Sequence, residues 1–241
     1  MRIKRKMIMI TIITVIFLVT AISFALNRES GFSKTDGEAN TQLAIEIAEN
    51  INDSGLIFEK DKVIGYVDDL PIYRSEVELK KIWYDGMNKS KSPDDYRTAF
   101  NKVLIEKQED LILEEFGIPV TKEEIKGYND EQKEMLYSST DFPEDDKKRV
   151  ESHNKYISAI GLTEEEYWEV LRPIEAKRQL SLFRVQELLH SELNKGNNEI
   201  IVNNKSIGFK MAENEQEIII DVNSIEYTII DDHYSNLLEG N

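Results

Sequence analysis

A run of twenty uncharged residues near the N-terminus constrains this chain more than any other feature. It extends from Met7 to Leu26 and contains no Asp, Glu, Lys or Arg. As a helix rising about 1.5 Å per residue it would span about 30 Å, which matches the hydrocarbon core of a bilayer. Because the run has no polar face, burial as a helix in a soluble core is a poor alternative. The sequence therefore predicts that residues 1–26 contain a membrane segment.

The charges around this run predict its orientation. Arg and Lys occupy four of the first six residues, and basic flanks stay in the cytoplasm, so the rest of the chain is expected on the extracytoplasmic side. Two interpretations stay open. Met7–Leu26 is an uncleaved single-pass anchor in the cell membrane, which its full length favours, or it is a signal peptide cleaved near Ala25 that releases a secreted protein. Residues 27–40 are polar and are predicted to form a tether.

Charge and cysteine content exclude several functional classes. The 241 residues carry a net charge of -16, and residues 27–241 alone hold 26 basic and 46 acidic side chains, a net charge of -20. Such a surface repels phosphate groups, so nucleic acid is not an expected partner. The chain contains no cysteine, which excludes disulfides, thiolate catalysis, zinc–thiolate sites and lipid attachment through a cysteine.

Residues 41–194 are predicted to form a helical domain that includes one short β-hairpin. The hairpin comprises Val63–Val67 and Pro71–Tyr73 around an Asp-Asp turn. Apolar residues at helical spacing, with capping signals between them, predict six helices. The first runs from Thr41 to Ile51. The next ones start at a Ser75/Glu78 capping box, at Ser92 followed by Pro93, at a Thr121/Glu124 capping box, near Pro143 and at a Thr163/Glu166 capping box, with stops at Gly117 and Gly161.

Two features mark the end of the helical domain. Pro173 lies ten residues into the last predicted helix, whose apolar stripe includes Tyr167, Ile174, Leu182 and Val185, and a kink or break is expected there. After Asn194 the pattern becomes β-prone. Residues 195–241 hold runs at 200–202, 207–209, 217–222 and 225–230, which pair either within the chain or with a partner.

No pattern of catalytic or metal-binding residues is present. The three histidines, His153, His190 and His233, are far apart in sequence, and His153 falls on the apolar face of its predicted helix, as a packing histidine does. Paired acids occur mostly in first helical turns, where the helix dipole stabilises them without any catalytic role. We therefore expect no enzyme activity, no metal and no cofactor.

Aromatic and methionine side chains offer the best candidates for a binding surface. In the adjacent pairs Trp83/Tyr84 and Tyr167/Trp168, both members cannot point into the core, so at least one of each is expected at an edge or on the surface. Exposed aromatic rings together with methionines make an adaptable apolar surface. The candidate client-binding residues are Trp83, Tyr84, Met87, Met135, Tyr137, Tyr167 and Trp168.

Three stretches of this chain carry a resemblance to a known family. They are KVIGYVDDLPIYRSEVELKK, AFNKVLIEKQEDLILEEFGIPVTKEEI and GLTEEEYWEVLRPIEAKRQLSLFRVQ. Their order and spacing over residues 61–193 resemble the N-terminal chaperone domain of SurA, which is also present in PrsA-type foldases. The resemblance implies a multi-helix domain that binds unfolded segments of exported proteins, with prolyl isomerase activity supplied by a separate parvulin domain.

The chain departs from this family in two respects. A parvulin domain occupies on the order of a hundred residues, whereas only 47 follow Asn194, so no isomerase activity is expected. PrsA-type proteins are usually lipoproteins, and this cysteine-free chain would use Met7–Leu26 instead. The expected function is that of an extracytoplasmic, non-catalytic chaperone for unfolded or exported polypeptides. The alternatives are an assembly factor with one dedicated protein partner and a degenerate peptidyl-prolyl isomerase.

Overall fold

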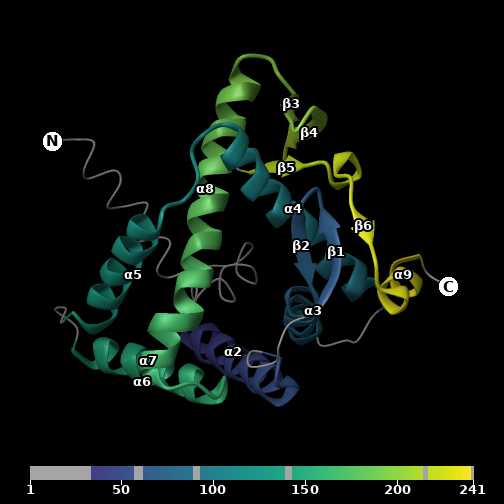
Figure 1. The fold of residues 1–241 in the computed structure, drawn as a ribbon. Coiled ribbons are helices and arrows are strands. Elements are labelled where there is room, and N and C mark those ends of the chain that lie inside the picture. The colour runs from purple at the N-terminus through teal and green to yellow at the C-terminus, as the bar shows by residue number, and fades with distance from the viewer. Residues whose placement is uncertain (1–33, 57–61, 89–92, 139–142, 214–216, 240–241) are drawn as a thin grey trace, which may run out of the picture.

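The computed structural model describes residues 34–56, 62–88, 93–138, 143–213 and 217–239, and it confirms a mainly helical fold with small antiparallel sheets (Figure 1). The predicted membrane segment Met7–Leu26 lies outside these residues. Within them, every helix is too short or too polar to cross a bilayer. The helices are α2 (Lys34–Ser54), α3 (Arg74–Asn88), α4 (Pro93–Glu115), α5 (Lys122–Tyr137), α6 (Pro143–Ala159), α7 (Glu164–Glu166), α8 (Arg172–Asn194) and α9 (Asp232–Glu239).

Local capping interactions define several helix ends. At the start of α5 the Thr121 hydroxyl accepts a hydrogen bond from the Glu124 N–H, and the Glu124 carboxylate accepts one from the Thr121 N–H, which is the predicted capping box. Thr163 and Glu166 repeat this arrangement at the start of α7. Gly117 and Gly161 follow α4 and α6 with φ of +68° and +79°. Such left-handed residues end helices, so the stops predicted there are confirmed.

The capping box predicted at Ser75 and Glu78 is wrong. The helix α3 begins one residue earlier, at Arg74, and the Tyr73 N–H donates to the Glu76 carboxylate over 2.9 Å. The Glu78 carboxylate instead accepts hydrogen bonds from the hydroxyls of Tyr96 and Tyr234, which belong to α4 and α9. These tertiary partners were not visible in the local sequence. The cap predicted at Ser92 lies outside the described residues.

Helix α2 begins at Lys34, so seven residues of the predicted tether 27–40 are helical. The helix contacts α3 on one side and α6 on another. It lies close to Gly86 of α3, where an added Cβ would lie 2.4 Å from Cγ1 of Ile47. Glycine at this position therefore allows the two helices to pack closely.

The interruption expected near Pro173 is present as a single π-helical turn. This turn, η1, spans Tyr167–Leu171 between α7 and α8, and the Arg172 N–H donates to the Tyr167 carbonyl five residues before it. Proline lacks an N–H and its ring clashes with the carbonyl four residues earlier, so a regular α-helix cannot pass through this position without local rearrangement. Pro173 instead lies in the first turn of α8, where proline is tolerated.

The strands form two three-stranded antiparallel sheets, in the orders β2–β1–β6 and β3–β4–β5. The first sheet contains the predicted hairpin, and its third strand comes from the C-terminal segment, which therefore pairs within the chain. The closing helix α9 was not predicted, and its first N–H groups are capped by the Asp231 carboxylate. The strands are β1 (Val63–Val67), β2 (Leu70–Tyr73), β3 (Glu199–Val202), β4 (Lys205–Met211), β5 (Ile218–Ile220) and β6 (Thr228–Ile229), with a 3₁₀ turn η2 at Val222–Ser224.

Buried apolar side chains fall into two clusters. The first core joins α4 and the C-terminal half of α8 to both sheets, and Phe100, Ile112, Val185 and Ile207 are among its members. The second core is smaller and consists of Ala48, Ile157, Ile160, Leu162 and Tyr167. Helix α2 links the two regions, because Ala48 belongs to the second core while the neighbouring Ile47 packs on α3.

Candidate functional site

The seven predicted client-binding residues do not form one surface. On α3 the rings of Trp83 and Tyr84 meet edge to face with centroids 5.1 Å apart. Tyr84 packs against the first core, while Trp83 and Met87 are partly exposed. Tyr137, Tyr167 and Trp168 lie in the other region, around the second core, and Met135 is a partly exposed residue of α5.

The three aromatic residues around the second core differ in exposure, because Tyr167 is buried, Trp168 is partly exposed and Tyr137 is exposed. Tyr167 is only 4% exposed, and its ring contacts Trp168 at 5.3 Å and His153 at 5.1 Å between centroids. Tyr137 is 41% exposed, and its hydroxyl donates to Glu164 over 2.8 Å. Burial and this carboxylate raise the pKa of Tyr137 to about 12. Within this group, Tyr137 therefore offers the most accessible aromatic surface, whereas Tyr167 serves as packing.

A network of ion pairs joins α3, α4 and α8. The Glu76 carboxylate lies 2.7 Å from Lys107 and 3.4 Å from Arg178, and Arg178 also lies 3.4 Å from Glu106. Lys80 pairs with Glu106 at 2.8 Å. Arg178 on α8 thereby bridges carboxylates on α3 and α4 and holds α8 beside them.

Four apolar residues lie on the segments that this network joins, or directly before them. On α3, Trp83 and Met87 continue the helical face that carries Glu76 and Lys80, since these positions recur every three or four residues. On α8, Ile174 lies one turn before Arg178 on the same face, and Val170 precedes it in η1. Figure 1 shows α2 lying between α3 and the end of α8 that follows η1, and α2 contacts α3. We call Trp83, Met87, Val170 and Ile174 the inner apolar face.

Two members of the inner apolar face are strongly exposed. Ile174 is 60% exposed and Val170 is 55% exposed, although both are aliphatic. The sequence pattern had placed Ile174 and Leu182 on the buried stripe of the last helix, and the structure overturns this, because Leu182 is also 37% exposed. The π-helical turn shifts the phase of the helix, so the stripe that begins at Tyr167 does not continue in register along α8.

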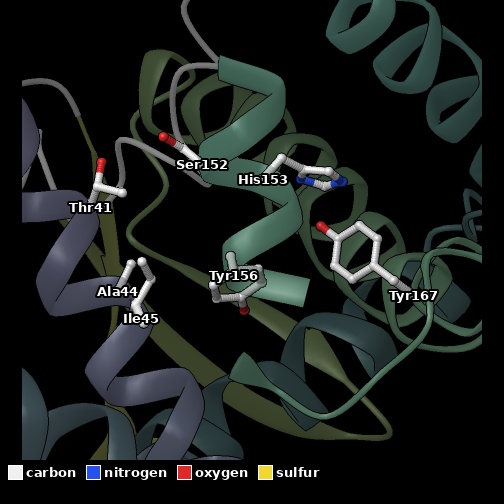
Figure 2. Close-up of a pocket in the computed structure, with 7 residues that line it drawn as sticks. All are labelled: Thr41, Ala44, Ile45, Ser152, His153, Tyr156 and Tyr167. Atoms are coloured by element: carbon white, nitrogen blue, oxygen red, sulfur yellow. The ribbon is translucent and has the colours of Figure 1, made fainter. Parts of the chain in front are cut away.

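The pocket beside His153 and the inner apolar face differ in their electrostatic surroundings. His153 is 5% exposed, and burial lowers its pKa to about 4, so this imidazole is neutral near pH 7. It lines a pocket between α2 and α6 (Figure 2), whose cavity volume of about 30 Å³ has room for little more than water. The inner apolar face instead adjoins paired charges, an arrangement that suits contact with a polypeptide carrying both apolar and charged groups.

Sequence reasoning identified half of the inner apolar face. It selected Trp83 and Met87 but missed Val170 and Ile174, and the signal that could have found them was the break expected at Pro173. In the described part of the chain, no three acidic or histidine side chains gather closely enough to hold a metal ion. Comparison with protein-family models, with curated proteins and with solved structures finds no match to this chain.

Proposed function

We propose that this protein is a non-catalytic polypeptide-binding protein that acts as a chaperone on the extracytoplasmic side of a membrane. Its client would be an unfolded or exported polypeptide with apolar segments. The inner apolar face would bind those segments, and Met7–Leu26 would hold the protein at the membrane.

The observation that carries this proposal is the exposure of Ile174 and Val170, next to an ion-pair network that also reaches α3, the helix of the partly exposed Trp83 and Met87. Fully burying one such aliphatic side chain contributes about 1.5–3 kcal/mol, so two together supply a useful but reversible affinity. The nearby charges of Glu76, Lys80, Glu106 and Arg178 are paired with one another, so an apolar segment could bind beside them without leaving an isolated charge buried.

The resemblance to the SurA N-terminal domain supports the same proposal. In that family a β-hairpin precedes a series of capped helices, and here β1 and β2 precede α3 through α8 in this order. The strongly acidic exterior, with a net charge of -20 over residues 27–241, favours basic clients and keeps complexes in solution.

Aggregation suppression tests the proposal. Residues 27–241 in molar excess are expected to slow the aggregation of a chemically denatured protein. A Val170→Ser/Ile174→Ser variant removes exposed apolar area from the inner face and should weaken this effect on the order of tenfold. The matched control is Ile201→Ser/Ile230→Ser, because these residues are 56% and 57% exposed on β3 and after β6. Equal activity of both variants would exclude the inner apolar face as the client site.

Two other functions make different predictions in the same preparation. A dedicated assembly factor would show no general suppression of aggregation but would capture one protein from a membrane extract. A degenerate prolyl isomerase would accelerate cis–trans exchange in a proline peptide.

A further inference from the structure

His153 is a buried histidine with an unusual environment. It lies on α6, is 5% exposed, and its ring contacts those of Tyr167 at 5.1 Å and Trp168 at 5.7 Å between centroids. Its buried Nε2 atom has no hydrogen-bond partner. Figure 2 shows the imidazole beside the Tyr167 ring, at the edge of the pocket that separates α6 from α2. The neutral ring is thus held by packing on at least one side rather than by a full set of hydrogen bonds.

The described residues of α2 that line this pocket carry no ionisable side chain. They are Thr41, Ala44 and Ile45. Ala48, one turn after Ala44, is fully buried in the second core. Contact between α2 and α6 therefore includes apolar packing near His153.

The remaining neighbours offer one acceptor and several opposing groups. From α7, the Glu164 carboxylate favours protonation of His153, but it already accepts a hydrogen bond from Tyr137. From α8, the Arg172 guanidinium disfavours protonation, although Glu175 pairs with it at 3.2 Å. From α5, Lys133 lies 5.6 Å from the Trp168 ring centroid.

Two phenols complete the surroundings of His153. Tyr156 of α6 and Tyr167 of η1 have pKa values raised by burial, so neither supplies a negative charge at neutral or acidic pH. The environment of His153 thus accommodates the neutral imidazole and not the imidazolium.

We propose that His153 is an acid-sensitive switch whose protonation releases α2 from α6. Helix α2 links the second core to α3, which carries Trp83 and Met87 of the inner apolar face. Release of α2 would therefore also loosen its packing on α3. His153 is not a member of the inner apolar face, and the test below uses the protein without a client, so its outcome does not depend on client binding.

The direction of the effect follows from the two pKa values. In the packed state the pKa of His153 is about 4, whereas a solvated histidine has a pKa of about 6.5. The open state therefore binds the proton more tightly than the packed state. Opening becomes more favourable as the pH falls below 6.5, and this effect levels off below pH 4. Linkage between these values favours opening by about 100-fold at pH 4 relative to pH 7.

Hydrogen exchange of the full chain tests this switch. After correction for intrinsic exchange rates, amides of residues 41–54 in α2 should lose about 100-fold in protection between pH 7 and pH 4, while those of α4 lose much less. His153→Gln, which stays neutral, should abolish this pH dependence, and His153→Phe should do the same if the glutamine variant folds poorly. His190→Gln on α8 is the matched control and should behave as the wild type.

A spectroscopic reading provides an independent measure. The chain has two tryptophans, so Trp83→Phe leaves Trp168, which contacts His153, as the single tryptophan. Its fluorescence should titrate with a midpoint near pH 4 to 5, and His153→Gln in that background should remove the transition. The proposal is overturned if α2 and α4 lose protection together, which indicates global unfolding. It is equally overturned if His153→Gln leaves the pH dependence of α2 unchanged.

Discussion

At the scale of single residues, buried ionisable groups give this protein two opposing responses to pH. Glu109 on α4 is 3% exposed, and burial raises its pKa to about 7. The charges of Lys102 and Arg178 lower this value, while Glu106 and Asp110 raise it. His153 behaves in the opposite sense, because its pKa in the folded state is lowered.

The signs of the two contributions follow from linkage. The Glu109 carboxyl is protonated in the folded state up to about pH 7 but ionises near pH 4.5 when unfolded, so its contribution to stability is lost as the pH rises through this window. For His153 the unfolded state binds the extra proton, so stability is lost as the pH falls from 6.5 to about 4. The two slopes partly cancel between these limits.

The Glu109→Gln variant should separate the contribution of Glu109 to the pH dependence of stability from that of His153. The amide imitates the neutral carboxyl, so the variant should be more stable than the wild type at pH 8, by up to about 3 kcal/mol. Its free energy of unfolding should no longer fall between pH 5 and pH 8, and the His153 slope should then be visible below pH 6.5. Urea denaturation at several pH values measures this. Glu187→Gln, at an exposed position on α8, is the control, and equal slopes in both variants would show that Glu109 is ionised in the folded state.

At the scale of elements, the packing of α2 on α3 depends on a glycine within a helix. Glycine in a helix interior costs about 1 kcal/mol relative to alanine, so its use at Gly86 has to be offset by a contact. That contact is Ile47, which is 3% exposed and whose Cγ1 would lie 2.4 Å from a new Cβ. The side chain of Ile47 is branched at Cβ and is restricted to few rotamers, so it cannot easily move away.

Gly86→Ala is therefore expected to lower stability by about 1–3 kcal/mol despite the better helix propensity of alanine. Gly127→Ala is the matched control. It lies in α5 with no atom within 4 Å of a new Cβ, so stability should rise by about 0.5–1 kcal/mol. Thermal unfolding measures both. Adding Ile47→Ala to Gly86→Ala should remove the clash. If the Gly86→Ala single variant were as stable as Gly127→Ala, the close packing of α2 on α3 would be contradicted.

At the scale of the whole molecule, the helices and the C-terminal segment share the first core. Ile200, Ile207, Phe209 and Ile220 of the second sheet are buried together with residues of α4 and α8. β6 completes the first sheet against β1, and α9 brings Tyr234 to Glu78 of α3. Removing this segment would expose the apolar sides of α4 and α8 and an edge of β1.

Residues 34–194 alone are accordingly expected not to fold cooperatively, whereas residues 34–241 should show one sharp thermal transition. Circular dichroism and limited proteolysis distinguish the two outcomes. A shorter truncation after Ile220 retains β3–β5 and should give an intermediate loss, since it removes the β6 and α9 contacts only. A stable, protease-resistant 34–194 fragment would show that the helices form an independent domain.

Much of the local structure could be predicted from the sequence, because the interacting groups lie within a few residues of one another. The capping boxes at Thr121 and Thr163 depend only on the threonine and on the glutamate three residues after it. The stops at Gly117 and Gly161 depend only on a residue that adopts positive φ without strain. The hairpin at β1 and β2 is determined by alternation around a turn. The mainly helical class follows from such signals.

The candidate site was less predictable, because its residues come from distant parts of the chain. Trp83 and Met87 were selected from composition and spacing, but the link between their helix α3 and the helix of Ile174 includes the Glu76–Arg178 ion pair, which joins residues 102 positions apart. The exposure of Ile174, directly after the π-helical turn, was not visible in the spacing of apolar residues. A periodic pattern reports that a face is apolar and not whether a partner covers it.

The sequence by itself determined the starts of α5 and α7, the ends of α4 and α6, the hairpin, and the apolar run that predicts a membrane segment, since each arises from short-range geometry or from composition. Only the tertiary structure decided that Glu78 binds Tyr96 and Tyr234, that β6 joins β1, and that α2 packs between Gly86 and the second core. These outcomes depend on contacts between residues that are far apart in the sequence. Burial, pKa values and exposed apolar area depend on the same contacts.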